Sequence, residues 1–486
     1  MASLEEIRKV RIEKMNLLLT KGINPFPAKT AREYSLSEVV EKFDELSKKE
    51  VLILAGRVMA IRGQGALIFF NINDGTALFQ GLFKKDEMDA EVFDLFVNTV
   101  DIGDFVEISG NLFVTKKGQQ TLQVKTWKML AKSLRQLPDK WDGLQDEEEC
   151  LRKRYLDIMF NPEVKDLVLK RTKFWNAVRE FLNTKSFMEV ETPIIQNTTG
   201  GAEAKPFITH HNALDMEVYM RISSELWLKR LMVAGFPKVF EIGRVFRNEG
   251  MDAEHLQDFT MMECYEAYSD YNQGMKFVEE MYKFVAEKTF NTLKFKIKTF
   301  EIDLGAKWEV YDFTETIKKM TGVDITNTDL KTVEAKLREL KVEYDTKNGF
   351  NLTRAIDNLW KYCRRQIAGP GFLINVPVMM EPLAKRMESN PNLVERFQII
   401  LAGSEMGKGF SELNDPVDQA GRFADQAKLR EAGDDEAQMT DGEFVEALEY
   451  GMPPTFGFGL SERLFSFLCD KPVRDCQIFP LLKPKK

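Results

Sequence analysis

The side chains best suited to chemistry lie in residues 238–268, where polar and apolar groups alternate. If this segment forms two strands around a loop, the period of two puts Arg247 and Glu249 on one face of the first strand. It also aligns four residues on one face of the second strand, namely Phe259, Met261, Glu263 and Tyr265. A guanidinium beside carboxylates and a phenol is costly in a dry core unless every polar group is satisfied. The pattern therefore favours a ligand pocket over the alternative, a salt-bridged face exposed to solvent.

The elements that position this hairpin belong to a larger α+β region, residues 165–486. A helical pattern over residues 165–185 precedes the sequence FMEVETPII, which we interpret as a strand interrupted at Pro193. Residues around 303–369 are helix-rich and fall between sheet elements. We therefore expect one sheet-containing domain with a helical insertion.

Residues 51–135 show a different pattern, with five short β-rich runs separated by turns. Asn73-Asp74-Gly75 is a strong hairpin signal between two of these runs. The runs predict a small closed barrel such as an OB-fold, which binds single-stranded nucleic acid on exposed aromatic rings. Phe69 and Phe70 are consecutive and point to opposite faces of their strand, so at most one is expected in the core. The other either stacks on a base or packs against the amino-terminal helix.

Two further regions complete the expected organisation. Residues 1–50 hold a lead-in and a helix over about residues 4–21, which aligns Leu4, Ile7, Met15 and Leu18 beside a basic side. This basic side either contacts RNA or is an ordinary helix face packed on a neighbour. Residues 136–164 are acidic and then basic, and we interpret them as a linker.

Composition excludes several classes of protein. The 486 residues carry a net charge of −8, which disfavours a surface built for duplex DNA and leaves RNA binding open. Five scattered cysteines and only three histidines argue against a disulfide framework and against a zinc site. The sequence has no run of about 18 apolar residues, and its charged start is unlike a signal peptide. We therefore expect a cytoplasmic protein with no membrane segment.

Ordered motifs along nearly the whole chain resemble those of the class II aminoacyl-tRNA synthetases. Phe246, Arg247 and Glu249 resemble motif 2, FMEVETPII resembles the dimer-forming motif 1, and GFGLSERLFSFL resembles motif 3. Within the class, GGAEAKPFITHHNALD, RISSELWLKRL, GFSELNDP and YGMPPTFGFG are similar to the lysyl-tRNA synthetases. The resemblance implies an OB-fold barrel for the anticodon, then a catalytic domain with an antiparallel sheet flanked by helices. It also implies a homodimer that uses ATP, L-lysine and tRNA(Lys).

The resemblance further implies roles at an ATP site, with Arg247 and Arg463 as catalytic residues. Arg247 would bridge the attacking carboxylate and the α-phosphate, while Phe259 and Arg463 would hold adenine between them. Glu249 would read the amino edge of adenine, and His255 would meet the outer phosphates. Because a lysine carboxylate is already ionised, its attack on phosphorus needs positioning and charge stabilisation rather than a general base.

The amino-acid pocket is implied in the same way. Glu412, with the Tyr265 hydroxyl, would receive the ε-ammonium of lysine. Glu225 would hold the α-amino group near the backbone of Gly201, and Glu263 would orient groups in the same pocket. Such a pocket should reject neutral analogues, because their binding would leave a buried carboxylate without a partner.

In the barrel, Arg62, Phe69 and Gln80 match the spacing of the family's anticodon-reading positions. Phe69 would stack on the middle uridine, and Arg62 and Gln80 would bond its edge. The resemblance thus favours the stacking interpretation of Phe69.

The sequence departs from the family at three places. Gln398 stands where an acidic residue usually holds Mg²⁺ together with Glu405, and Lys408 stands where asparagine is usual. We hypothesise that the Lys408 ammonium replaces part of the job of one Mg²⁺ or binds the lysine carboxylate. The motif 2 loop also reads His255-Leu256-Gln257-Asp258, and motif 3 is one residue shorter before Arg463. These changes favour a lineage variant over a paralogue with altered chemistry.

Two other functions remain open from the sequence. The aspartyl and asparaginyl synthetases share the same layout, but an aspartate pocket needs cations where this chain has Glu225 and Glu412. A non-catalytic or protein-modifying paralogue has no use for the anticodon residues Arg62, Phe69 and Gln80.

Overall fold

The structure is a computed structural model that describes residues 3–138, 146–344, 350–432 and 437–485. The chain divides into two compact units, Met1–Cys150 and Leu151–Lys486. Within the described ranges, no helix combines the length and the apolar character needed to cross a membrane.

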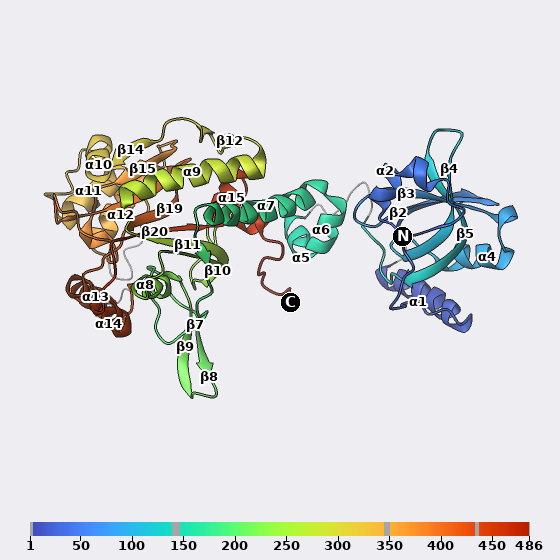
Figure 1. Cartoon of the computed structure of the whole chain (residues 1–486), viewed down its shortest axis with the longest axis horizontal. Helices are drawn as coiled ribbons and strands as arrows, with labels where there is room; N and C mark the ends of the chain where they lie inside the picture. The colour runs from blue at the N-terminus through green and yellow to red at the C-terminus, as the bar shows by residue number, and fades with distance from the viewer. Residues whose placement is uncertain (1–2, 139–145, 345–349, 433–436, 486) are drawn as a thin grey trace. The chain divides into compact units, whose positions relative to one another are not determined.

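The first unit is a closed five-stranded barrel in the order β1-β2-β3-β5-β4 (Figure 1). Its strands are β1 (Leu52–Gln64), β2 (Leu67–Asn73), β3 (Leu78–Lys84), β4 (Phe105–Val114) and β5 (Gln120–Ala131). Around them lie α1 (Leu4–Thr20), α2 (Leu36–Glu41), α3 (Phe43–Leu46), η1 (Lys85–Glu87) and α4 (Ala90–Thr99). The β3–β5 pair is parallel and the other neighbours are antiparallel. The predicted OB-fold is therefore confirmed.

The β2–β3 hairpin explains how the barrel sorts its two adjacent phenylalanines. Gly75 adopts φ +91°, and its amide donates a 2.7 Å bond to Asn73 Oδ1, so the turn closes as the sequence predicts. Phe70 is buried in the barrel core, with ring centroids 5.2 Å from Phe83. Phe69 points to the outer face and is half-buried. The prediction that only one of the two lies in the core is confirmed.

Helix α1 packs on the barrel unit by the predicted face, except at its first residue. Leu18 is fully buried, but Leu4 is 69% exposed, so the expected apolar stripe is wrong at its start. The buried Arg11 lies on the packed face, because its guanidinium donates to the carbonyls of Ser133 (3.0 Å), Arg135 (3.1 Å) and Ile102 (3.0 Å). Part of the basic side therefore serves the unit's own packing.

The predicted linker 136–164 is helical in its second half, and residues 139–145 lie outside the described part. Helices α5 (Glu147–Arg152) and α6 (Arg154–Phe160) precede α7 (Pro162–Thr184). Buried Arg154 pairs with Asp157 at 2.7 Å and donates to the carbonyls of Asp475 and Gln477. One charged residue of the predicted linker thus joins α6 to the carboxyl-terminal segment.

The second unit is built on an eight-stranded sheet in the order β14-β15-β18-β19-β20-β11-β10-β6. Its pairs are antiparallel except β14–β15 and β10–β6. The strands are β6 (Met188–Glu189), β10 (Lys238–Phe246), β11 (Asp258–Ala267), β14 (Glu309–Asp312), β15 (Gly371–Ile374), β18 (Arg396–Leu401), β19 (Ser404–Ser411) and β20 (Thr455–Ser461). Small sheets are formed by β7 (Ile195–Gln196), β8 (Ile208–His211), β9 (Met216–Met220), β12 (Lys294–Ile297), β13 (Phe300–Asp303), β16 (Val376–Pro377) and β17 (Leu393–Val394). The predicted antiparallel-rich sheet is confirmed.

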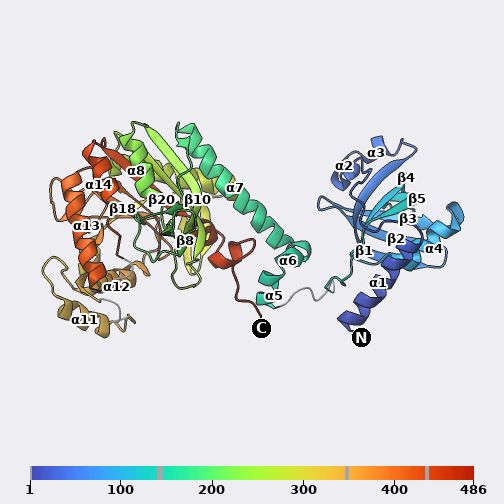
Figure 2. The same ribbon diagram turned by 90° about the horizontal axis from the view of Figure 1, so that it is seen from below.

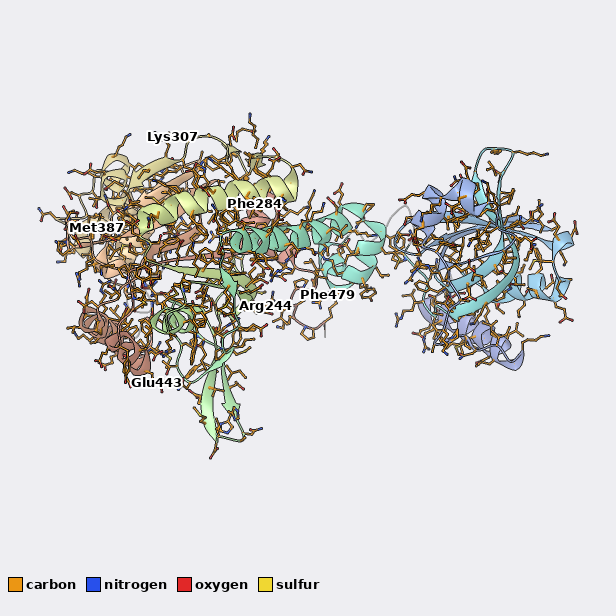
Figure 3. All side chains as sticks on the ribbon, viewed as in Figure 1. Arg244, Phe284, Lys307, Met387, Glu443 and Phe479 are labelled. Atoms are coloured by element: carbon orange, nitrogen blue, oxygen red, sulfur yellow. The ribbon has the colours of Figure 1, made fainter. Side chains whose placement is uncertain are left out.

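Helices cover both faces of this sheet (Figures 1 and 2). On one face, α7 and α9 (Tyr271–Phe290) bury their apolar stripes, and the labelled Phe284 lies on α9 (Figure 3). The other face packs against α8 (Glu225–Val233), α10 (Phe313–Thr321), α11 (Leu330–Glu339), α12 (Leu352–Arg364), α13 (Pro416–Glu431) and α14 (Gly442–Glu449). Short elements complete the unit: η2 (Val378–Met380), α15 (Arg463–Leu468) and η3 (Val473–Cys476). Successive strand residues join opposite cores, as in the pair Cys264 and Tyr265.

The predicted insertion 303–369 contains α10, α11 and α12, but it is not separate from the sheet. It includes β14, whose residue Val310 lies opposite Phe372 of β15. Trp360 of α12 is buried in the same core as Leu373 of β15. The insertion thus forms a wall over the sheet face that carries Glu263 and Tyr265.

Candidate active site

A cavity of about 440 Å³ lies on this sheet face, between β11, β18, β19 and β20 and the residues that follow β10. Every site residue predicted for the catalytic domain lines it: Gly201, Glu225, Arg247, Glu249, His255, Phe259, Glu263, Tyr265, Gln398, Glu405, Lys408, Glu412 and Arg463. The structure therefore brings together in one place a set of residues that spans most of the second unit.

The expected hairpin forms, with Glu241 opposite Glu263 in the β10–β11 register. The first strand ends at Phe246, however, so Arg247 and Glu249 lie in the following loop rather than on the strand. The Arg247 amide donates to the Gln257 carbonyl at 2.8 Å and the Glu249 amide to the Arg247 carbonyl at 2.9 Å. The first of these bonds continues the β10–β11 pairing one residue beyond Phe246, so Arg247 stays on the face that carries Glu241 and Glu263.

One end of the cavity is a cluster of buried carboxylates. Glu263 Oε1 accepts from Ser223 Oγ at 2.6 Å and from the Ser224 amide at 3.1 Å, and Oε2 accepts from Tyr265 Oη at 3.2 Å. Burial and the nearby Glu225 raise the pKa of Glu263 to about 7. Tyr265 is thus bonded to Glu263 in this structure, rather than to Glu412 as expected.

Glu412 is 1% exposed and follows the end of β19. Its Oε2 forms an ion pair with Lys229, while Oε1 has no hydrogen-bond partner among the described residues. Burial, Glu225 and Glu263 raise the pKa of Glu412 well above its ordinary value, despite the opposing effect of Lys229. An empty cluster with this bias attracts protons, and an ammonium group can take their place.

Glu225 begins α8 and is buried. Its Oε1 accepts a 2.6 Å bond from Lys229, and its amide donates to Ser223 Oγ at 3.1 Å. Gly201 lies against it with φ +87°, and a Cβ there would come within 2.8 Å of the Glu225 Cβ. Glycine is therefore needed both for the backbone conformation and for the close approach.

The other end of the cavity carries guanidinium groups. Arg247 Nε donates to the Ile222 carbonyl at 3.2 Å, and Cζ lies 5.3 Å from the centroid of Phe259. Burial lowers the pKa of Arg247 from its usual value, although Glu249 and Glu263 act in the opposite direction. No carboxylate of the described residues forms an ion pair with Arg247, so its remaining donors are available to an anion.

The motif 2 loop holds the second guanidinium in this structure. Arg463, the first residue of α15, is bonded to Glu254, which also binds Lys298 at 3.0 Å. Although burial opposes ionisation, Arg463 and Lys298 keep the pKa of Glu254 below its usual range. The exposed His255 instead bonds Asp252 at 2.8 Å through Nδ1. The bond to Glu254 uses one terminal nitrogen of Arg463 and leaves its Nε without a hydrogen-bond partner among the described residues.

The predicted metal ligands are already used by protein groups. Gln398 Oε1 accepts from Arg396, and Glu405 binds Trp360 Nε1 at 2.8 Å and Arg364 at 2.9 Å. In the described part of the chain, no group of three or more His, Cys, Asp or Glu could hold a metal ion. The pair Gln398 and Glu405 therefore does not fit a resident Mg²⁺.

Lys408 lies directly opposite Gln398 across the β18–β19 pair, at a register shift in the ladder. Its ammonium donates to the buried Glu381 at 3.0 and 3.2 Å, and Arg396 Nε lies 3.1 Å from the same carboxylate. Lys408 and Arg396 hold the pKa of Glu381 below its usual value against the effect of burial. Two cations thus share one carboxylate at this position, which leaves positive charge beside the cavity.

The candidate anticodon residues belong to the first unit and share the outer face of its barrel. Arg62 lies opposite Phe69, and Gln80 lies opposite Asn71, which is two residues along from Phe69 on the same face. Gln80 Oε1 accepts from Thr121 at 2.9 Å, so its amide group remains a donor. Together these side chains form an aromatic surface with polar edges.

Sequence reasoning missed Glu254, Glu381 and Arg396, which line the cavity, and Lys229, which lies behind its lining residues Glu225 and Glu412. Lys229 had a readable signal, because it follows Glu225 by four residues and therefore shares its helix face. The bonds of Glu254, Glu381 and Arg396 join distant segments and have no such local signal.

Comparisons with known proteins agree with this geometry. The family described as tRNA synthetases class II (D, K and N) matches residues 146–483, and the OB-fold nucleic acid binding domain matches residues 52–130. The lysine–tRNA ligase of Thermotoga maritima is 45% identical over 99% of this chain and 97% of its own length. Those of Thermosipho africanus and Carboxydothermus hydrogenoformans are 43% and 42% identical over 99% of this chain and 97% and 99% of their own lengths. The chain therefore belongs to the class II tRNA synthetases, within the lysine–tRNA ligase group.

Proposed function

We propose that the cavity activates L-lysine with ATP and that the protein then transfers lysine to tRNA, the reaction of a lysine–tRNA ligase. One observation carries the proposal. Among the described residues, an oxygen of the buried Glu412 has no hydrogen-bond partner and Arg247 has no ion pair, and both side chains line the same cavity. The carboxylate suits a cationic side chain, and the guanidinium suits a reacting phosphate.

The first step joins a lysine carboxylate oxygen to the α-phosphorus of ATP and breaks the bond from that phosphorus to the bridging oxygen. Pyrophosphate leaves with the electron pair, and lysyl-adenylate remains. No proton moves, because the carboxylate is ionised before it attacks. Arg247 would contact both reacting groups, and losing such a charge-stabilising contact typically costs roughly 3 to 4 kcal/mol of barrier.

The carboxylate cluster selects the amino acid. Glu412, supported by Glu263 and Tyr265, would receive the ε-ammonium, and Glu225 beside Gly201 would receive the α-ammonium. A neutral side chain of the same length would leave Glu412 without a counter-charge in a dry wall. Leucine is therefore excluded strongly, whereas ornithine and arginine are the harder competitors.

The nucleotide would lie between Phe259 and Arg463, with Glu249 at the adenine amino group and His255 at the outer phosphates. Because Glu254 binds one terminal nitrogen of Arg463, it would hold the plane of the guanidinium in place for stacking on adenine. The Mg²⁺ that accompanies ATP in solution enters as part of the substrate. Because Gln398 and Glu405 do not fit a resident ion, the Lys408 ammonium is proposed to supply positive charge at that position.

In the second step a hydroxyl at the 3′ end of the tRNA attacks the lysyl carbonyl carbon, and AMP leaves. Arg62, Phe69 and Gln80 are proposed to read the anticodon, with Phe69 stacked on its middle base. Their shared outer face and the donor amide of Gln80 support this assignment.

The motif 1 region is proposed to form a homodimer. Apolar side chains are exposed there, including Met188 (42%), Ile194 (44%) and Ile195 (54%). Light scattering on the full chain tests this, and a monomeric mass at micromolar concentration would contradict it. We also propose that the protein acts in the cytoplasm.

Amino-acid-dependent exchange of pyrophosphate into ATP tests the function. We expect exchange with lysine and none with aspartate or asparagine, followed by charging of tRNA(Lys). Exchange with aspartate or asparagine would favour those synthetases instead. Exchange with lysine but no charging of tRNA would favour a protein-modifying paralogue.

A further inference from the structure

Lys229 on α8 has no exposed side-chain surface and contacts both carboxylates proposed to hold the amino groups of lysine. Its ammonium lies 2.6 Å from Glu225 Oε1 and pairs with Glu412 Oε2. The rings of Phe410 and Phe444 lie 5.4 and 5.9 Å from Nζ and exclude water from the pair. The sequence motifs assign no task to this residue.

Counting charges shows why the cluster needs this ammonium. Glu225, Glu263 and Glu412 bring three negative charges, and Lys229 brings one positive charge. L-lysine adds two ammonium groups at neutral pH, which balances the cluster, and its carboxylate is balanced by Arg247. The buried Glu381, which also lines the cavity, already has its own cations in Lys408 and Arg396. The cluster of Glu225, Glu263, Glu412 and Lys229 is therefore balanced with lysine bound only if Lys229 is present.

The geometry of Glu412 gives Lys229 a second task. The ion pair occupies Oε2 and leaves Oε1 without a hydrogen-bond partner among the described residues. Although burial opposes a charged ammonium, Glu225 and Glu412 together raise the pKa of Lys229, so it stays charged at neutral pH. A fixed charge on one oxygen favours the ionised carboxylate, against the effect of burial, and sets which oxygen meets the ligand.

We propose that Lys229 is a positioning residue that determines lysine specificity, by countering the charges of Glu225 and Glu412 from within the wall and by directing one Glu412 oxygen to the substrate ε-ammonium. This inference rests on the proposed function of the cavity. Without Lys229, the cluster carries one surplus negative charge and takes up a proton instead. A protonated Glu412 no longer distinguishes an ammonium from a methyl group, so discrimination should fall.

The test compares Lys229→Met with Lys229→Arg and with the control Lys238→Met. Lys238 also pairs with a glutamate, Glu266 at 2.7 Å, and lies 5.4 Å from the ring of Phe187. Glu266 does not line the cavity, whereas both carboxylate partners of Lys229 do. Calorimetry measures binding of L-lysine and of L-norleucine, which lacks only the ε-ammonium, at about pH 6, 7 and 8. Thermal unfolding is measured alongside.

For Lys229→Met we expect the preference for lysine over norleucine to fall on the order of tenfold or more, in line with coupling between close buried charges. The rise of lysine affinity with pH should move to higher pH, because the remaining carboxylates hold a proton more tightly. Lys229→Arg should keep most of the preference, and Lys238→Met should keep all of it. If Lys229→Met does not fold, Lys229→Gln replaces it, since glutamine can still hydrogen-bond without a charge.

If Lys229→Met or Lys229→Gln lowers the thermal stability but keeps the wild-type preference for lysine over norleucine and the wild-type pH profile, the proposal is overturned. Lys229 would then only stabilise the fold through its ion pairs. Failure of the proposed function looks different, because the wild-type protein would then show no lysine binding and no lysine-dependent exchange.

Discussion

Gly457 on β20 offers a sharp test of the lysine pocket, because a single methyl group there meets the carboxylate proposed to read the substrate. A Cβ at this position would lie 2.0 Å from Glu412 Oε1 and 2.6 Å from Tyr265 Cε1. Both neighbours belong to the buried wall, so neither can swing into solvent. Glu412 would have to retreat by more than 1 Å to reach an ordinary contact, which separates it from an ε-ammonium.

Gly457→Ala should therefore lose most of one charge-assisted hydrogen bond to lysine, worth about 1.5 to 3 kcal/mol. That loss corresponds to a rise of roughly 10- to 150-fold in the KM for lysine. The KM for ATP should change little, because the nucleotide is proposed to bind at the other end of the cavity. Pyrophosphate exchange at varied lysine and varied ATP separates the two constants.

Gly459→Ala is the matched control, since it lies two residues along the same strand and also lines the cavity. Its nearest neighbour is the flexible end of Met261, with Cε at 2.9 Å, and Glu263 Cγ is at an ordinary 3.6 Å. Its KM for lysine should stay within about threefold of wild type, since only a flexible side chain must move. An unchanged lysine KM in Gly457→Ala, or an equal loss for ATP, would refute the placement of lysine beside Glu412.

Four further outcomes are expected. Arg247→Ala should lower kcat of the exchange reaction roughly 100- to 1,000-fold, whereas Arg244→Ala, which removes a partly exposed pair with Asp258 (Figure 3), should stay near wild type; similar losses in both would contradict the assignment. The pKa of Glu263 is raised to about 7, and a bound ammonium favours the ionised form of this carboxyl group. Lysine binding should therefore release a proton, and the affinity for lysine should rise as the pH increases through about 7. Calorimetry in buffers of different ionisation enthalpy checks this, and Glu263→Gln should lose that proton release. Phe69→Ala should lose about 1 to 3 kcal/mol of base stacking, which raises the KM for tRNA by about 5- to 150-fold without changing pyrophosphate exchange. Phe69→Tyr should retain tRNA charging. Charging by the alanine variant at the wild-type level would argue against stacking. The double change Gln398→Glu with Lys408→Asn should increase the number of Mn²⁺ ions bound per ATP complex, which electron paramagnetic resonance measures. The same number of ions in the wild-type protein and in the variant would contradict the hypothesis that the Lys408 ammonium replaces a metal ion.

Several features could be predicted from the sequence because their causes are local. The turn Asn73-Asp74-Gly75 needs a left-handed glycine wherever it occurs, and the alternation on β11 fixes which residues share a face. Local rules failed where a distant partner decided the outcome. Arg11 is buried because three carbonyls from other segments bind it.

The sequence by itself determined the barrel, because its period of two is a property of short stretches of chain. The resemblance of its ordered motifs to a known family indicated the antiparallel catalytic sheet and the residues around the cavity. Only the tertiary structure decided how the charges pair. Lys229 meets Glu412 from a helix far away in the sequence, Glu254 binds Arg463, and Arg396 binds Glu381. Such pairs depend on strand register and helix placement, since Coulomb attraction in a dry wall acts between neighbours in space rather than in sequence.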